Sequence, residues 1–202
     1  MKRVSALLAQ GLEEVECLMV VDLLRRAEVQ VTLVSVSGER VVTGSHGIAI
    51  VTDRLIEEMD FSAEDMIFLP GGMPGVSNLV RHALVAQTLR AQAEQGKELA
   101  AICAAPSILG KMGLFANKRF TCYPGWERGI DGINGAEWSG AAVYKGRRTF
   151  DGLHQVRLNR IFEQCRHRAI RFQIFGVNGA AVFGIGDEDV AQTLFQIADV
   201  FG

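Results

Sequence analysis

Short apolar runs alternate with helical patterns in the first half of the chain, and this alternation constrains the fold more than any other feature. The runs have the length of buried strands and lie at 4–9, 29–37, 65–72 and 97–103. Between them, a 3.6-residue apolar period predicts helices over about 13–27 and 83–95. Such alternation is typical of a parallel α/β sheet with helices on both faces and right-handed crossovers.

Smaller elements accompany this pattern. Residues 40–53 predict a small hairpin with its turn at Gly44-Ser45-His46-Gly47. Pro106 suits the first turn of a helix that follows the run at 97–103. Beyond Gly113, residues 119–125 predict another strand and residues 136–150 an alternating pair.

Composition limits the function classes. The chain has 202 residues, enough for one domain with a sizeable core, and a net charge of −2. That charge argues against nucleic-acid binding and against membrane-surface binding. No run approaches the roughly 20 apolar residues of a spanning helix, and two early glutamates argue against a signal peptide.

Cysteine usage points to a reducing compartment. Four cysteines are scattered without C-x-x-C spacing: Cys17, Cys103, Cys122 and Cys165. This scatter disfavours a zinc site and a thioredoxin-like motif. Without a secretion signal, we expect a cytoplasmic protein that holds neither a metal nor a cofactor.

Cys103 is the first candidate for chemistry. It ends an apolar run and precedes a proline-marked helix in "AAICAAPSILGKMG", residues 100–113. In an open α/β sheet, ligands bind at this carboxyl edge, and a helix N-terminus there lowers the pKa of a thiol. Strand, nucleophile and helix in this order form the nucleophile elbow of α/β-hydrolases. The alternative is a buried core cysteine, which is common.

Glu16 is the second candidate. It shares an apolar helical stripe with Leu12, Val20, Leu23 and Ala27, which predicts a core-facing carboxyl with a raised pKa. A protonated glutamate at this edge would donate a hydrogen bond to a thiolate and act as a general acid and base. Alternatively, Glu16 only marks the acidic start of the helix together with its acidic neighbours.

A glycine turn supplies candidate backbone donors. "LPGGMPG", residues 69–75, follows a strand, and N–H groups of Gly71 and Gly72 could form an oxyanion hole with Ala104. The alternative is an ordinary connection between a strand and a helix. The glycine spacing fits no Walker or dinucleotide motif.

A histidine base for Cys103 is not evident. His46 lies in the hairpin turn, His82 at a helix start, and His154 and His167 in the last quarter of the chain. None has a sequence reason to reach Cys103, so we expect surface histidines and no papain-like pair.

Taken in order, these motifs resemble the ThiJ/PfpI family, also called the parkinsonism-associated deglycase family. The likeness covers residues 1–148 and rests on six ordered segments: "GLEEVE" (11–16), "LLRRAEVQVTLVS" (23–35), "VTGSHGI" (42–48), "FLPGGMPG" (68–75), "AAICAAPSILGKMGL" (100–114) and "TCYPGWE" (121–127). The resemblance implies a flavodoxin-like three-layer sandwich that forms a homodimer.

The resemblance also implies site residues. The elbow cysteine of the family matches Cys103, its helix glutamate matches Glu16, and its oxyanion glycines match Gly71 and Gly72. Some members have a histidine where this chain has Tyr123, which could donate a hydrogen bond but cannot be the usual base at neutral pH.

The last part of the chain departs from the family. A closing helix and a Ser-Arg-Gly-Pro-Gly-Thr-like turn are missing from residues 146–172, which are rich in arginine. Residues 149–202 are therefore either a replaced tail, within the same domain or displaced, or the product of a shifted reading frame near Arg148.

Family activities imply two kinds of function. One is cofactor-free conversion of an α-oxoaldehyde, methylglyoxal to lactate, or deglycation of a glycated substrate, with Cys103 as nucleophile and Glu16 as acid and base. The other is a non-enzymatic thiol redox sensor or stress chaperone, because an accessible thiolate is oxidised first under oxidative stress. An intracellular cysteine peptidase and a thiamine-thiazole biosynthesis protein fit the residues less well.

Overall fold

The computed structural model describes residues 2–138, 171–177 and 180–186, and its centre is one parallel sheet. In order across the sheet, the strands are β5 (Arg54–Leu55), β2 (Gln30–Ser35), β1 (Arg3–Leu8), β6 (Met66–Leu69) and β7 (Glu98–Ala101). All four neighbouring pairs are parallel. The predicted parallel α/β sheet is therefore confirmed, with strand bounds a few residues shorter than the apolar runs.

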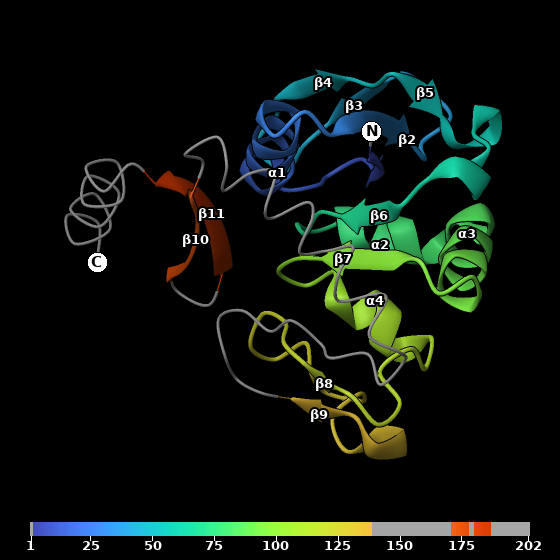
Figure 1. The fold of residues 1–202 in the computed structure, drawn as a ribbon, viewed down its shortest axis with the longest axis vertical. Coiled ribbons are helices and arrows are strands. Elements are labelled where there is room, and N and C mark those ends of the chain that lie inside the picture. Colours follow the sequence, from blue (N-terminus) through green and yellow to red (C-terminus); the bar gives the residue numbers. More distant parts are fainter. Residues whose placement is uncertain (1, 139–170, 178–179, 187–202) are drawn as a thin grey trace.

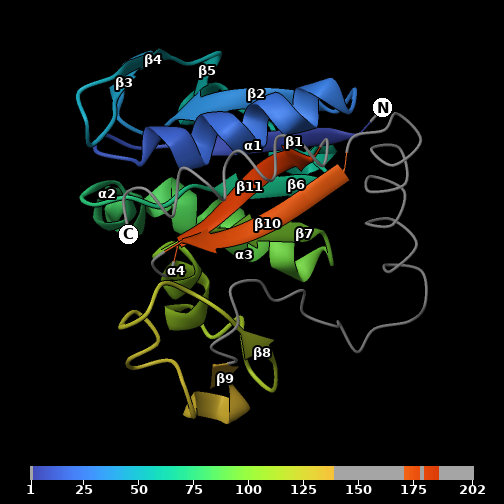
Figure 2. The ribbon, with the colours of Figure 1, turned by 90° about the vertical axis from the view of Figure 1, so that its left-hand side faces the viewer.

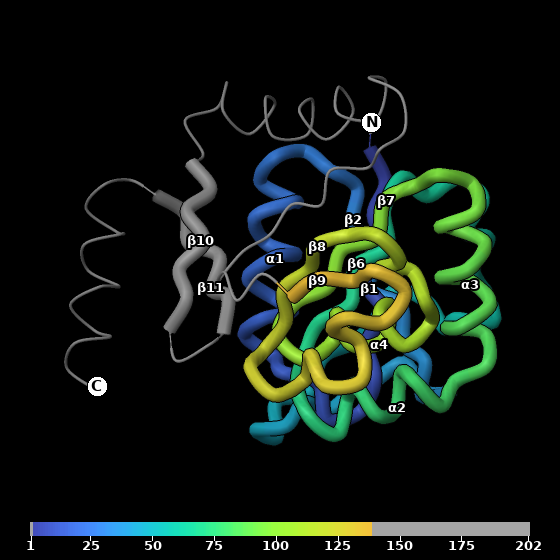
Figure 3. The backbone as a smooth tube through the Cα atoms, turned by 90° about the horizontal axis from the view of Figure 1, so that it is seen from below, coloured from blue at the N-terminus to red at the C-terminus, as the bar shows by residue number. Residues whose placement is uncertain are grey.

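Helices cover both faces of this sheet (Figures 1 and 3). The described helices are α1 (Glu14–Arg26), α2 (Gly75–Arg81), α3 (Ala83–Glu94) and α4 (Pro106–Lys111). Helix α1 lies on one face, and α2, α3 and α4 lie on the other. The sequence pattern predicts α1, α3 and the start of α4 but misses α2, because this short helix follows directly on the glycine turn.

Two apolar clusters separate the three layers. Alternate residues of β1 divide between them: Ala6 and Leu8 pack toward α1, and Leu7 packs toward α2, α3 and α4. These side chains are fully buried, as the two-residue period of a strand requires when both faces are covered. The three-layer arrangement fixes which loops meet at the carboxyl edge of the sheet.

Smaller elements lie outside the main sheet. They are an antiparallel hairpin of β3 (Val41–Thr43) and β4 (Ala49–Val51), a parallel pair of β8 (Arg119–Phe120) and β9 (Glu137–Trp138), an antiparallel hairpin of β10 (Arg171–Val177) and β11 (Ala180–Gly186), and 3₁₀ turns at Ile56–Glu58, Phe61–Ala63 and Ile133–Gly135. The first hairpin has the predicted turn, closed by the Gly47 N–H donating to the carbonyl of Gly44 at 3.2 Å.

The predicted strand at 119–125 is wrong over most of its length. Strand β8 comprises Arg119 and Phe120, and the chain later turns, with the Trp126 N–H donating to the Tyr123 carbonyl at 3.0 Å. The Tyr123 N–H donates to the Cys103 carbonyl at 2.7 Å, so by Tyr123 the chain contacts the elbow instead of continuing beside β9.

Part of the sequence-based picture lies outside the described residues. This holds for residues 146–170, where the closing helix of the family is missing from the sequence, and for most of the predicted pair at 136–150. Within 171–186, strand β11 of the second hairpin lies beside α1 (Figure 2). Among the described residues, no helix is long and apolar enough to cross a membrane.

Candidate active site

The candidate site lies where the strand order of the main sheet reverses. β1 connects through α1 to β2 on one side, whereas β6 connects through α2 and α3 to β7 on the other. The loops after β1, β6 and β7 therefore diverge at one carboxyl edge, the usual ligand position of an open α/β sheet. These loops and the first turn of α1 carry Glu16, Gly71, Gly72 and Cys103.

Cys103 has a strained backbone at this edge. Its φ is 59°, a left-handed conformation that is uncommon for a residue with a Cβ. The Tyr123 N–H donates to the Cys103 carbonyl at 2.7 Å, and Ala104 and Ala105 after it are buried. The surrounding packing thus holds the residue in a conformation that the chain would otherwise avoid.

Three groups surround the Cys103 sulfur. The backbone N–H groups of Gly72 and Ala104 donate to Sγ, and the Glu16 carboxyl shares a hydrogen bond with the thiol. Gly72 has φ 89°, and a Cβ there would meet the backbone of Leu12 and Glu13 at the start of α1. Glycine is therefore required for the turn after β6 to bring its N–H to the sulfur.

Gly71 has a different partner from the one that the sequence predicts. Its N–H donates to Glu16 Oε2 at 3.1 Å, so this N–H orients the carboxyl. A Cβ at Gly71 would stand 2.5 Å from the Cβ of Cys103, which is too close for any side chain. The structure thus brings the carboxyl and the thiol together across a position that only glycine can occupy.

The proton affinities of this pair are coupled. Burial raises the pKa of Glu16, as its place on the apolar stripe predicts, and the charge of Glu13 adds to this effect. Burial and the Glu16 carboxylate raise the pKa of Cys103 to about 11, against the lowering by the N–H groups of Gly72 and Ala104. A thiolate at Cys103 and a carboxylate at Glu16 repel each other because the two groups are in hydrogen-bond contact. The pair therefore releases its two protons in separate steps.

The expected lowering of the thiol pKa by the helix N-terminus is therefore wrong. Helix α4 has only six residues and begins at Pro106, which has no N–H to offer. The dipole of this short helix, which begins three residues after Cys103, lowers the thiol pKa by less than burial and the adjacent Glu16 carboxylate raise it. The fraction of Cys103 that is thiolate consequently depends on whether the shared proton resides on the sulfur or on Glu16.

Tyr123 is close to Cys103 through its backbone. The hydrogen bond between the two residues uses the Tyr123 N–H, while the tyrosine side chain is 38% exposed. This contact anchors the segment after β8 beside the elbow. A role for the Tyr123 hydroxyl in the reaction stays a proposal that rests on the family resemblance.

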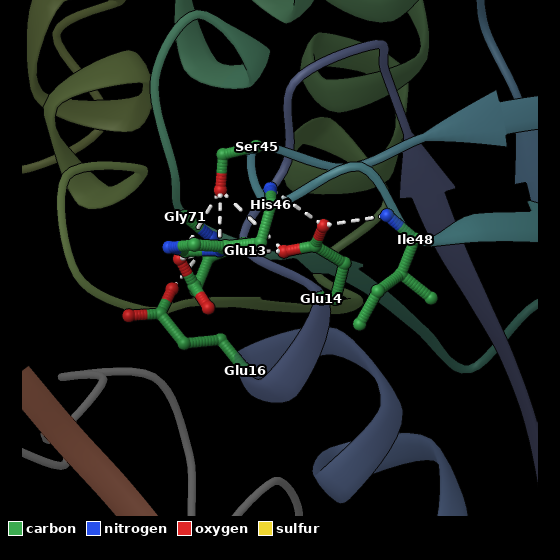
Figure 4. A network of polar contacts seen from close by, with 7 residues as sticks. All are labelled: Glu13, Glu14, Glu16, Ser45, His46, Ile48 and Gly71. Carbon is green, nitrogen blue, oxygen red and sulfur yellow. Dashed lines mark hydrogen bonds and ion pairs between the residues drawn. The ribbon is translucent and has the colours of Figure 1, made fainter.

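Glu14 and His46 form a neighbouring network that the sequence did not predict (Figure 4). The Glu14 side chain is 2% exposed, and its Oε1 accepts the His46 N–H at 2.8 Å and the Ile48 N–H at 3.3 Å. His46 Nδ1 lies 3.0 Å from Glu14 Oε2 and 3.5 Å from Glu13 Oε2. The available signal was weak: Glu14 shares helical spacing with the buried residues Cys17 and Val21.

Charges in this network reinforce one another. Burial alone would raise the pKa of Glu14, but hydrogen bonds from the His46 imidazole, the helix backbone and the N–H groups of His46 and Ile48 lower it to about 2. The two glutamates in turn raise the pKa of His46. The Glu13, Glu14 and His46 ligand atoms lie within 4.8 Å of one another, close enough to share a metal ion, but the Glu14 oxygens already accept hydrogen bonds from the turn.

Within the part of the chain that the structure describes, the remaining histidine lies away from this site and the remaining cysteines are inert. His82 lies between α2 and α3, with Nε2 3.8 Å from Glu57 Oε1. Burial raises the pKa of the Cys17 and Cys122 thiols to about 12, which favours the unreactive protonated form. His154, His167 and Cys165 lie outside the described residues.

Comparison with known proteins identifies relatives over the same region. A family model described as "DJ-1/PfpI family" matches residues 2–150. "Protein dj-1beta" of Drosophila melanogaster is 37% identical over 123 residues, which are 61% of this chain and 66% of that protein. "Glutathione-independent glyoxalase DJR-1.2" of Caenorhabditis elegans is 34% identical over 55% of this chain and 58% of its own length. The chain therefore spans less than two thirds of the length of these curated relatives.

Solved structures agree with the fold. "Toxoplasma gondii DJ-1, oxidized" has a TM-score of 0.72 and 28% identity, covering 84% of this chain and 96% of its own. A mutant of a DJ-1 superfamily protein from Salmonella typhimurium has a TM-score of 0.70 and 26% identity over 83% of this chain and 98% of its own. These likenesses support the α/β three-layer sandwich.

Proposed function

The chain belongs to the DJ-1/PfpI family, and on this basis we propose that it converts small α-oxoaldehydes to 2-hydroxy acids without a cofactor. Methylglyoxal to lactate is the model reaction, and deglycation of a glycated substrate is the related activity. The observation that carries the proposal is the hydrogen-bonded pair of Cys103 and Glu16, with two backbone N–H groups on the sulfur. One relative that carries the name of a glutathione-independent glyoxalase supports the same reaction class.

The reaction begins with transfer of the Cys103 proton to Glu16. The sulfur then attacks the aldehyde carbon and forms a hemithioacetal, and Glu16 returns the proton to the new oxygen. That oxygen develops its charge one carbon away from Sγ, within reach of the Gly72 and Ala104 N–H donors. The elbow thus supplies both the nucleophile and the donors for the charge that it creates.

Glu16 then moves a second proton. As carboxylate, it removes the proton from the former aldehyde carbon, giving an enediolate, and returns it to the neighbouring carbon, while the hydroxyl proton of the hemithioacetal passes to the neighbouring oxygen. The product is a thioester of the 2-hydroxy acid on Cys103, which water hydrolyses to the free acid and the thiol. The overall change adds one water molecule, and no external oxidant or reductant takes part.

The raised pKa of Glu16 suits this role. A carboxyl that is reluctant to ionise takes the proton of a neighbouring thiol more readily than an ordinary glutamate would. Because the pair shares its last proton, part of the singly deprotonated population carries the charge on sulfur. This internal transfer replaces the histidine base that the sequence lacks near Cys103.

A homodimer is part of the proposal. Apolar side chains are exposed on α1 and on the adjacent hairpin: Val15 at 58%, Leu18 at 39%, Ile48 at 52% and Val51 at 72%. Such clustering on neighbouring elements favours an interface with a second copy. Sedimentation velocity that finds only monomers at micromolar concentration contradicts this part.

The decisive experiment measures methylglyoxal consumption and lactate formation by purified protein, Cys103→Ala and Glu16→Gln. We expect turnover in the unaltered protein and losses of at least about 100-fold in both variants, the usual scale for nucleophiles and general acids and bases. Turnover that persists in either variant contradicts the mechanism. Selective peroxide oxidation of Cys103 without any dicarbonyl turnover would instead favour the thiol redox sensor.

A further inference from the structure

The turn between β3 and β4 lies against the first turn of α1, which carries Glu16 of the proposed catalytic pair (Figure 4). Its residues Ser45 and His46 come from a hairpin far from Cys103 in sequence, and the reaction proposed above does not use them. The Ser45 N–H donates to the Leu12 carbonyl at 2.8 Å, which fixes the turn to the start of α1. An exposed imidazole is thereby held at a defined place next to the site.

Glu14 orients this imidazole. Its buried carboxylate accepts the His46 N–H at 2.8 Å and faces Nδ1 of the ring at 3.0 Å. The ring is held at its base by these contacts, although the side chain is 67% exposed. Glu14 thus acts as an anchor, and His46 is the group whose charge responds to solution pH.

Glu13 connects His46 to the catalytic pair. Its Oε2 lies 3.5 Å from His46 Nδ1 and accepts from Ser45 Oγ at 3.3 Å. Glu13 and Glu16 are three residues apart at the start of α1, a spacing at which like charges on a helix disfavour each other. The Glu13 carboxylate accordingly raises the pKa of Glu16.

The charged neighbours of each group define the coupling. Among the described side chains, Glu16 faces Glu13 and Cys103, and His46 faces Glu13 and Glu14. Glu13 is the member common to both sets. Protonated His46 therefore forms an ion pair with the same carboxylate that faces Glu16, and its positive charge offsets that of Glu13.

We propose that Glu13 and His46 are positioning residues that set how the last proton is shared between Glu16 and Cys103. The Glu13 carboxylate favours the proton on Glu16 and hence the charge on sulfur. Protonated His46 offsets Glu13 and moves the balance back toward the Glu16 carboxylate and the neutral thiol. Site reactivity then rises as His46 loses its proton. This inference rests on the proposed function only for the pairing of Cys103 with Glu16.

The test measures the alkylation rate of Cys103 by iodoacetamide from pH 5 to pH 9, with peptide mass spectrometry to separate the cysteines. The unaltered protein is compared with Glu13→Gln, His46→Gln, His46→Lys and the control Glu94→Gln. Glu94 is an exposed residue at the end of α3, on the other face of the sheet, and its variant makes the same change in net charge.

Glu13→Gln and His46→Gln are expected to change the alkylation rate of Cys103 in opposite directions. Glu13→Gln lowers the plateau rate by about two- to fivefold, whereas His46→Gln raises the rate at the lower pH values, where His46 is protonated, and matches the unaltered protein on the plateau. His46→Lys keeps the cation at every pH, so its rate stays low where the unaltered protein becomes faster. Glu94→Gln leaves the profile unchanged. Adding His46→Gln to Glu13→Gln produces a smaller shift than His46→Gln alone, because Glu13 raises the pKa of His46 and its loss leaves the imidazole less protonated.

Three outcomes overturn the inference: shifts in the same direction for Glu13→Gln and His46→Gln, no shift beyond that of Glu94→Gln, or a Glu13→Gln effect that persists in Glu16→Gln protein. Thermal melting of each variant checks that the fold is intact, and His46→Lys retains a charged, exposed side chain should His46→Gln unfold. Because alkylation needs no substrate, expected shifts without methylglyoxal turnover would contradict the proposed reaction but leave this inference standing.

Discussion

Two glutamates of α1, separated by a single residue, show how neighbouring carboxyl groups acquire opposite properties. Glu14 is almost completely buried, yet its pKa is lowered to about 2, whereas Glu16 is half-buried and its pKa is raised. Burial opposes ionisation in both. The difference lies in the donors: two N–H groups of the β3–β4 turn and an imidazole serve Glu14, but one N–H and a thiol serve Glu16.

This difference separates an anchor from a proton carrier. A carboxylate that is saturated with donors stays ionised and fixes the elements that supply them. A carboxyl with few donors and a negative neighbour gives up its proton less readily than an ordinary glutamate, and it can pass that proton on. Helix geometry places the two roles on different sides, because two residues correspond to about 200° of rotation around the axis.

A glycine leaves room for each of these two carboxyl groups. Replacing the two glycines should give the largest difference in Cys103 reactivity between the two regions. A Cβ at Gly71 would meet Glu16 and Cys103, and a Cβ at Gly44 would meet Glu14. Gly71→Ala should therefore slow Cys103 alkylation about 100-fold through displacement of the reacting groups, and Gly44→Ala by less than about fivefold. Both should lower the free energy of unfolding by roughly 1–3 kcal/mol through overcrowding.

Alkylation kinetics and urea unfolding measure these effects in parallel. Gly47→Ala is a matched control, since a Cβ there meets nothing within 4 Å and only the left-handed backbone, with φ 80°, resists it. Similar losses of reactivity for Gly71→Ala and Gly44→Ala would contradict the division into anchor and proton carrier.

The pH dependence of stability should have opposite signs for the two carboxyls. The folded pKa of Glu14 lies below its ordinary value of 4.5, so its contribution is complete above pH 4.5 and is lost as the pH falls toward 2. The folded pKa of Glu16 lies above 4.5, so its contribution is complete below pH 4.5 and is lost as the pH rises through the folded pKa.

Urea unfolding of Glu14→Gln and Glu16→Gln from pH 2.5 to pH 8 checks these signs. Glu14→Gln should be less stable than the unaltered protein by about 1–3 kcal/mol at neutral pH, because buried donors lose a charged acceptor, and this gap should close in acid. Glu16→Gln should gain relative stability as the pH rises. Parallel curves for the two variants would refute the contrast.

Tyr123 provides the smallest expected effect. Its contact with Cys103 uses the backbone N–H, which Tyr123→Phe retains. We expect less than about a twofold change in alkylation and turnover, the range of a surface substitution away from the reacting atoms. A tenfold loss would instead assign the hydroxyl a role in the reaction, as the resemblance to members with a histidine at this position suggests.

Local patterns in the sequence predicted most of the fold. Apolar runs of strand length and a 3.6-residue period depend on neighbours along the chain, and they located β1, α1, β2, β6, α3 and β7. The elbow at Cys103 and the place of Glu16 on the apolar stripe of its helix were also predicted from patterns among residues that are close in sequence. The sequence did not predict helix α2, which follows the glycine turn at Gly75, or the early end of the strand that begins at Arg119, after which Tyr123 contacts the distant Cys103.

The chemistry of the site depended on contacts between distant segments. The sequence determined by itself a parallel α/β sheet, a cysteine at its carboxyl edge and a glutamate on the facing helix. Only the tertiary structure decided that Gly71 serves Glu16, that the thiol pKa is raised, and that His46 lies beside Glu13. Periodicity is a property of adjacent residues, whereas a pKa is set by every charge and donor that folding brings within a few ångströms.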